Sequence, residues 1–205
     1  NLGSITSNDI VLEVGPGRGA LTEKLLASDV ASVHAVEIDR DLVKGLRRRF
    51  AGQPRFSLEE GDVLKVPLIP VSGLPATKVV ANIPYNITGP LLERLLGRLD
   101  RPPRDRYRLL ILLLQKEVAE RIRAVPGERS FSALSVRLQL MARCRRICTV
   151  SPDCFDPPPK VWSEIIAIEP FDLEMCLHPD LARQVESLLN KAFFSRRKML
   201  RNTLV

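Results

Sequence analysis

The sequence places glycines and acidic residues where predicted strands end. Gly15, Gly17 and Gly19 follow the apolar run 10–14 and precede an amphipathic segment. Glycines at such a turn let a ligand approach the backbone closely. Glu37, 20 residues after Gly17, ends the next predicted strand, where a carboxylate can bind both hydroxyls of a ribose. A tight turn without a ligand would explain the glycines alone, but the added carboxylate favours a cofactor that contains adenosine.

The spacing of these glycines discriminates between two classes of cofactor. It differs from the G-x-G-x-x-G pattern of dinucleotide-binding folds, in which the turn and a helix N-terminus hold a pyrophosphate. The two histidines, His34 in a predicted strand and His178 late in the chain, offer no acid–base pair for hydride transfer. A dehydrogenase is therefore disfavoured. An adenosine cofactor without a pyrophosphate fits better, and S-adenosylmethionine (SAM) is the common one.

Asp62 follows Gly61 at the end of a third predicted strand. Parallel strands end at the same edge of a sheet, so we expect Asp62 beside the glycine turn and Glu37. There its carboxylate can accept a hydrogen bond from the exocyclic amine of the cofactor adenine. The alternative for this position is an aspartate that caps the backbone of its own turn.

The tetrapeptide Asn82-Ile83-Pro84-Tyr85 ends a fourth predicted strand and is the most specific feature of the sequence. Its residue types suit methylation of a planar amine whose lone pair is delocalised into a ring. The Asn82 side-chain oxygen and the carbonyl before Pro84 can both accept from that amine and direct its lone pair at a sulfonium methyl group. Pro84 fixes the turn, and Tyr85 offers a ring on which a base can stack. A strand-end turn with a core tyrosine is the structural alternative.

Alternating strand and helix patterns position these residues. Short apolar runs predict strands at residues 10–14, 33–38, 56–58, 78–81 and 109–114, and later at 146–150 and 164–168. Apolar residues at helical spacing predict helices over 20–27, 41–50, 90–99, 116–123 and 132–142, and from 179 onward. The alternation predicts an α/β fold with a doubly wound, Rossmann-like parallel sheet and helices on both faces.

The composition is that of a basic globular protein. The 205 residues include 31 Lys and Arg against 24 Asp and Glu, a formal net charge of +7, and 45% are hydrophobic. That apolar share supports a sizeable core and argues against disorder. The longest apolar run, Leu109–Leu114, is far shorter than the roughly 20 residues that span a bilayer. No secretory signal is visible, so we expect a cytoplasmic protein, or an organellar one if a preceding segment carried a transit peptide.

The four cysteines are predicted to be reduced thiols. Cys144, Cys148 and Cys154 have a spacing that fits no zinc pattern, and the first two lie in a strand-like stretch, while Cys176 stands apart. We therefore expect no metal.

Cations gather near the C-terminus. Lys191, Arg196, Arg197, Lys198 and Arg201 occur with no acidic residue between them. Such a cluster favours contact with nucleic-acid phosphates, although a solvated basic face would have the same composition.

These features resemble those of a known family, the KsgA-type ribosomal RNA adenine dimethyltransferases, over nearly the whole chain. The resemblance is carried, in order along the chain, by Val11-Leu12-Glu13-Val14-Gly15-Pro16-Gly17, Glu37-Ile38-Asp39, Gly61-Asp62, Asn82-Ile83-Pro84-Tyr85-Asn86-Ile87, Leu114-Gln115-Lys116-Glu117-Val118-Ala119, Leu134-Ser135-Val136, Phe155-x-Pro157-Pro158-Pro159-Lys160-Val161 and Arg196-Arg197-Lys198-Met199-Leu200-Arg201-Asn202.

The resemblance implies transfer of methyl groups from SAM to N6 of two neighbouring adenosines near the 3′ end of small-subunit rRNA. The partner would be that rRNA or a pre-30S-type particle, bound by a monomer that needs neither membrane nor metal. Cofactor contacts are implied for Glu13, Gly15, Gly17, Glu37, Ile38, Asp62, Val63 and Asn82. Catalytic roles are implied for Asn82, Pro84, Tyr85 and Phe155, and RNA binding for Arg196, Arg197, Lys198 and Arg201.

Phe155 is implied to clamp the flipped base opposite Tyr85. From the residues alone, an aromatic side chain before the prolines at 157–159 is equally compatible with a core anchor. These prolines predict that residues 155–161 form an extended loop.

The sequence departs from the family pattern in three places. We expect it to begin after the N-terminal segment with a Gln-x-Phe-Leu element and to end as the C-terminal helical domain starts. Phe131-Ser132-Ala133 stands where the family often has Tyr-Gly before Leu-Ser-Val. The expected division is a SAM-binding catalytic domain over 1–172 and the start of a helical RNA-binding domain over 173–205.

Two other functions stay open at this point. A large-subunit rRNA adenine methyltransferase of the antibiotic-resistance type would use the same crevice and tetrapeptide, but the triple proline and the C-terminal basic motif resemble the small-subunit group more closely. A non-catalytic assembly factor or organellar transcription factor could retain the fold and bind RNA. The intact Asn82 and Tyr85 argue against loss of the chemistry.

Overall fold

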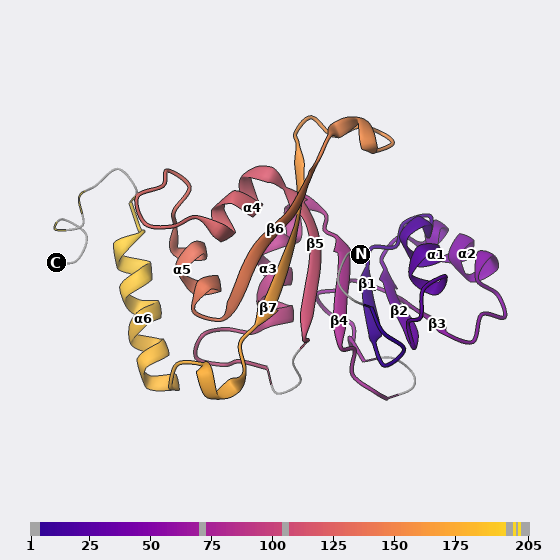
Figure 1. Cartoon of the computed structure of the whole chain (residues 1–205), viewed down its shortest axis with the longest axis horizontal. Coiled ribbons are helices and arrows are strands. Elements are labelled where there is room, and N and C mark those ends of the chain that lie inside the picture. The colour runs from indigo at the N-terminus through magenta and orange to yellow at the C-terminus, as the bar shows by residue number, and fades with distance from the viewer. Residues whose placement is uncertain (1–4, 70–72, 104–106, 196–198, 200, 202–205) are drawn as a thin grey trace.

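The computed structural model describes residues 5–69, 73–103, 107–195, 199 and 201. Its centre is one seven-stranded sheet with the strand order β3-β2-β1-β4-β5-β7-β6 (Figure 1). The strands are β1 (Ile10–Val14), β2 (Ser32–Glu37), β3 (Phe56–Glu60), β4 (Lys78–Asn82), β5 (Leu109–Gln115), β6 (Ala142–Val150) and β7 (Ser163–Pro170). The predicted doubly wound α/β fold is confirmed.

Helices cover both faces of the sheet. They are α1 (Ala20–Leu26), α2 (Arg40–Arg49), α3 (Thr88–Leu96), α4 (Lys116–Arg123), α5 (Ala133–Gln139) and α6 (Pro179–Ala192), with short 3-10 turns η1 (Tyr85–Ile87), η2 (Pro152–Cys154) and η3 (Leu173–Met175). On one face Val11 packs with Leu25 of α1, whereas its neighbour Leu12 belongs to the cluster on the other face that includes Leu91 of α3. Among the described residues, no helix is both long and apolar enough to cross a membrane.

The sheet is parallel only in part, which corrects the expectation of a parallel sheet. β1 to β5 pair in parallel, whereas β7 is antiparallel to both β5 and β6. The reason is the connection between β6 and β7: residues 151–162 hold only the short turn η2, and strands joined without a crossover helix pair antiparallel. In Figure 1 this connection projects beyond the end of the sheet.

β6 is also longer than predicted. It begins at Ala142, inside the segment expected to be helical, and α5 already ends at Gln139. From Ala142 the burial alternates, with Ala142 and Cys144 inward and Arg143 and Arg145 outward, which is the period of a strand with one buried face. That alternation outweighs the helical spacing further upstream.

The interior strand β5 explains why the apolar run Leu109–Leu114 is continuous. Leu110, Leu112 and Leu114 are fully buried in one cluster, while Leu109 and Ile111 lie in a cluster on the opposite face. A strand covered on both sides needs apolar residues at every position, not at alternate ones. This rigid centre fixes the ends of β4 and β5, where the chemistry is expected.

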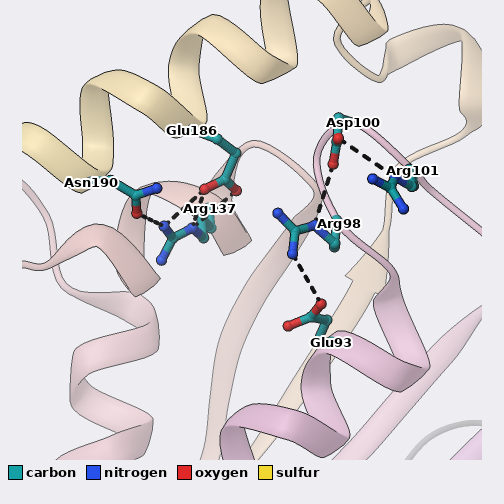
Figure 2. A network of polar contacts seen from close by, with 7 residues as sticks. All are labelled: Glu93, Arg98, Asp100, Arg101, Arg137, Glu186 and Asn190. Carbon is teal, nitrogen blue, oxygen red and sulfur yellow. Dashed lines mark hydrogen bonds and ion pairs between the residues drawn. The ribbon is translucent and has the colours of Figure 1, made fainter.

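Helix α6 is joined to the rest of the protein by a polar network and a shared core. Arg137 Nε donates to both carboxylate oxygens of Glu186, at 3.0 and 2.8 Å, and its Nη2 donates to Asn190 at 2.9 Å (Figure 2). Nearby, Arg98 pairs with Glu93 and Asp100, and a cavity of about 550 Å³ lies between α3, α5 and α6. Ala182 and Leu189 of α6 are buried in the same cluster as Leu138 of α5.

Candidate active site

One edge of the sheet collects the residues expected to do chemistry. Because β1 to β4 are parallel, their carboxyl ends meet there, with Val14 in register with Val36 and with Ala81. The glycine turn follows β1, Glu37 ends β2 and Asn82 ends β4. In open α/β sheets this edge is where ligands bind.

The glycine turn leaves room beside its backbone. Gly17 has a φ of +59°, which favours glycine, and a Cβ built on it would meet nothing within 4 Å. Gly15, at a φ of +67°, lies against the end of β4: a Cβ there would be 3.7 Å from the carbonyl oxygen of Asn82. The turn therefore borders open space on one side and the Asn82 segment on the other.

Glu37 is fixed by backbone amides. Its Oε1 accepts from the N–H groups of Ile38 at 2.9 Å and Asp39 at 3.0 Å, and its Oε2 accepts from the N–H of Gly17 at 3.1 Å. The carboxylate thus bridges the ends of β1 and β2. The whole residue is only 6% exposed. The side chain of Ile38, beside it, is 67% exposed, an apolar surface at the edge of the site.

Glu13 is a buried carboxylate with spare bonding capacity. Its Oε2 accepts from the Thr22 hydroxyl at 2.7 Å, but its Oε1 is buried with no hydrogen-bond partner in the described structure. Burial raises the pKa of Glu13 to about 7, and the charge of Glu37 acts in the same direction. A buried polar atom without a partner is uncommon and fits a site that a polar ligand completes. Thr22 itself escaped sequence analysis, although its place in the first turn of the helix after the glycines was a signal.

Asp62 caps the backbone of its own turn, as the alternative interpretation of this position predicted. Its Oδ1 accepts from the N–H of Leu64 at 2.9 Å, and its Oδ2 lies 3.6 Å from Lys65 Nζ. Val63, next to it, is buried. Capping leaves the Asp62 side chain 30% exposed at the same edge as Glu37, so the cap and a contact with adenine are compatible.

Asn82 differs from these carboxylates because its side chain has no partner among the described residues. Its side chain is exposed and forms no hydrogen bond with the described residues. Ile83 anchors the strand end: it is buried, and its N–H donates to the carbonyl of Leu113 at 3.2 Å. Tyr85 begins η1 after Pro84, and its side chain lies outside the described part of the structure.

A cavity of about 330 Å³ brings two distant segments together. It is lined by Asn82, Ile83 and Pro84 on one side and by Phe155, Asp156, Pro157 and Pro159 on the other. Phe155 is half-buried and lines this cavity opposite Asn82, and its role as a clamp on a flipped base stays a prediction. The two segments are far apart in sequence. They line the same cavity because β5 and β7 are neighbours in the sheet.

The remaining predicted residues lie away from this edge or outside the described residues. Arg201 is exposed, whereas Arg196, Arg197 and Lys198 lie outside the described residues. All four cysteines are free thiols, and burial raises the pKa of Cys144 to about 12. Across the described ranges, no group of three or more His, Cys, Asp or Glu residues could hold a metal ion.

Solved structures define the class of protein to which this fold belongs. The chain is similar to a dimethyladenosine transferase from Plasmodium falciparum, with a TM-score of 0.80 and 31% identity over 98% of this chain and 68% of that one. It is also similar to the 23S rRNA methyltransferase ErmE, with a TM-score of 0.77 and 26% identity over 98% of this chain and 77% of that one. The class is that of Rossmann-like methyltransferases.

The family follows from the sequence matches. The model of the ribosomal RNA adenine dimethylase family matches residues 3–205, and the chain belongs to this family. A ribosomal RNA small subunit methyltransferase A from Prochlorococcus marinus (strain MIT 9313) is 69% identical over 200 residues, which are 98% of this chain and 71% of that relative. A relative of the same name from Parasynechococcus marenigrum (strain WH8102) is 68% identical over 96% of this chain and 65% of its own length.

Proposed function

We propose that this protein transfers methyl groups from SAM to N6 of two adjacent adenosines near the 3′ end of small-subunit rRNA during ribosome assembly. The observation that carries the proposal is a juxtaposition. The amide-bound Glu37 and the open glycine turn share one sheet edge with the uncommitted Asn82 and the cavity that Phe155 lines. Membership of the adenine dimethylase family supports the same reading.

The residues at β1 to β3 fit SAM. Glu37 would accept from the ribose hydroxyls, Ile38 would cover one face of the adenine, and Asp62 with Val63 would meet its edge. Gly15 and Gly17 would let the methionine part lie against the backbone, above Glu13. When bound, SAM supplies an electrophilic methyl group on a sulfonium.

The residues at β4 would orient the target. The Asn82 oxygen and the carbonyl of Ile83 would accept from the two N–H groups of the adenine N6 and aim its lone pair at the methyl group. Held in this way, the nitrogen would form the new N–C bond as the S–C bond breaks, and its surplus proton would pass to water. Tyr85 and Phe155 would hold the flipped base from opposite sides.

Charge and domain organisation complete the proposal. The net charge of +7 and the cations at Arg196, Arg197, Lys198 and Arg201 would bind rRNA in a pre-30S-type particle. We retain the division into a catalytic domain over 1–172 and the start of an RNA-binding domain over 173–205. In this account the protein acts as a monomer in the cytoplasm.

A large-subunit target is the second candidate, because ErmE shares the fold at 26% identity. The test is to incubate the full-length protein with labelled SAM and, separately, undermethylated small subunits, large subunits and bare RNA. We expect label in the small subunits. Label confined to large subunits would support the second candidate, and no label in any of the three would contradict both.

A further inference from the structure

The only tryptophan of the sequence is exposed and directly follows the loop that lines the proposed site. Trp162 directly precedes β7 and is 52% exposed, and its neighbour Val161 is 43% exposed. A tryptophan side chain is a large apolar surface that proteins normally cover. Its exposure leaves a large aromatic ring available to a ligand.

The backbone holds Trp162 against the start of α4. The N–H of Lys116 donates to the carbonyl of Trp162 at 2.9 Å, and Gln115 is in register with Ser163. A cavity of about 440 Å³ lies beside the ring and is lined by Gln115, Lys116, Glu117, Glu120, Lys160, Val161 and Trp162. The ring thus sits on the end of the central sheet.

The charges around this cavity favour an anionic ligand. Its two acidic residues are engaged: Glu120 lies 3.8 Å from Lys116, and Glu117 lies 2.7 Å from Arg121. Lys160 is exposed and forms no ion pair with the described residues. One cation beside the exposed ring is therefore uncompensated.

The cavity beside Trp162 lies near the one that Asn82 lines, although the two share no lining residue. Asn82 is in register with Leu113, and Leu113 with Ile165, so Trp162 lies two strands across and three residues along from Asn82. With strands about 4.8 Å apart and about 3.3 Å per residue, their Cα atoms are roughly 14 Å apart. The single segment 155–162 lines both cavities, with Phe155 in the first and Trp162 in the second.

We propose that Trp162 stacks on a base of the rRNA substrate that flanks the methylated adenosines, while Lys160 contacts a backbone phosphate. The inference rests on the proposed function, since it extends the binding track of the same substrate. A few nucleotides of single strand cover the separation from Asn82. Stacking on an aromatic ring tolerates any base, so Trp162 contributes affinity and register and does not select the base.

The test compares Trp162→Ala and Trp162→Phe with wild type in the full-length protein. The probe is an unmodified RNA stem–loop that carries two adjacent adenosines, used for binding and for methyl transfer. Leu173→Ala is the matched control, because Leu173 is 52% exposed in η3, beyond the opposite end of β7. Tryptophan emission, taken as the difference between wild type and Trp162→Phe, reports directly on the ring.

The expected result is quenching of Trp162 emission by RNA and a KM for RNA roughly 5- to 140-fold higher in Trp162→Ala. Trp162→Phe should recover most of this loss, while kcat at saturating RNA, SAM affinity and the thermal midpoint should stay near wild type. Lys160→Gln should flatten the plot of log K against log salt by about 0.7 to 0.9 units.

Two outcomes separate the inference from the proposed function. If the wild type methylates the RNA but Trp162→Ala matches Leu173→Ala and emission is unchanged, the stacking proposal is wrong and the function stands. If RNA quenches the emission but no RNA or subunit is methylated, the proposed function is wrong and the binding surface stands. Quenching only by added ribosomal proteins would overturn the choice of RNA as the ligand.

Discussion

The sheet edge that carries the proposed site has two halves, and they are built in opposite ways. At β1 to β3, Glu37 and Asp62 are already engaged by backbone amides and Glu13 is buried. At β4 to β7, Asn82 and Trp162 are exposed, and neither side chain hydrogen-bonds to a described residue. The first half is preorganised for one small ligand of constant shape, whereas the second leaves its side chains free for a large substrate that has to enter and leave.

Replacing Asn82 should give the largest effect and tests the second half. Asn82→Ala should lower the single-turnover rate of methyl transfer by about 10²- to 10³-fold at saturating SAM, because the lost hydrogen bond matters most as the amine becomes tetrahedral. SAM affinity should stay nearly unchanged. Asn190→Ala, the same change in α6, is the control and should leave the rate intact. A wild-type rate in Asn82→Ala would refute the proposed role.

Glu13 makes the first half sensitive to pH. Its pKa is raised from 4.5 to about 7 by burial, so the folded state binds a proton that the unfolded state has released. The contribution of Glu13 to the free energy of unfolding should be largest below pH 4.5 and should fall by up to about 3 kcal/mol as the pH rises through 7. Glu13→Gln should remove this fall and be the more stable protein at pH 8.

Urea unfolding at pH 5 and pH 8 measures the effect of Glu13. Glu174→Gln, which changes an exposed carboxylate, serves as the control and should keep the wild-type pH dependence. An identical pH dependence in wild type and Glu13→Gln would show that Glu13 is ionised in the folded protein at both pH values.

Glu37 should control SAM binding without a direct role in the transfer step. Glu37→Ala removes a charge-assisted contact worth roughly 1.5–3 kcal/mol, so calorimetry should show SAM affinity weakened about 10- to 150-fold. Asp62→Ala should weaken it by a similar factor, because it too removes one charge-assisted hydrogen bond to the cofactor. The turnover of both variants should recover when SAM is saturating. Unchanged affinity in both would eliminate this cofactor site.

The smallest effect is expected on the free energy of unfolding, at the ion pair between α5 and α6, far from the proposed site. Arg137→Leu breaks the contact with Glu186, whose side chain is 14% exposed, and should lower the free energy of unfolding by about 1 kcal/mol after allowance for solvent. Arg183→Leu, at an exposed position of the same helix α6 as Glu186, should change it little. Methyl transfer should survive both changes. A loss of activity in Arg137→Leu would mean that α6 also positions the site.

Sequence patterns predicted the first half better than the second, for a physical reason. The glycine turn and Glu37 lie 20 residues apart in one strand–helix–strand unit, so local spacing brings them together. Asn82 and Phe155 line one cavity only because β7 pairs antiparallel with β5. No local pattern encodes that pairing, and the family resemblance supplied it. Trp162 was missed because a single aromatic after a proline loop has no periodic signal.

The most direct test of the central claim is the identity of the methylated nucleoside. Undermethylated small subunits are incubated with labelled SAM and the full-length protein, and their RNA is digested to nucleosides and separated. The account predicts label in N6-methyladenosine at early times and in N6,N6-dimethyladenosine at completion, with neither formed by Asn82→Ala within the time that wild type needs. Label in any other nucleoside, or an equal yield from Asn82→Ala, would contradict it.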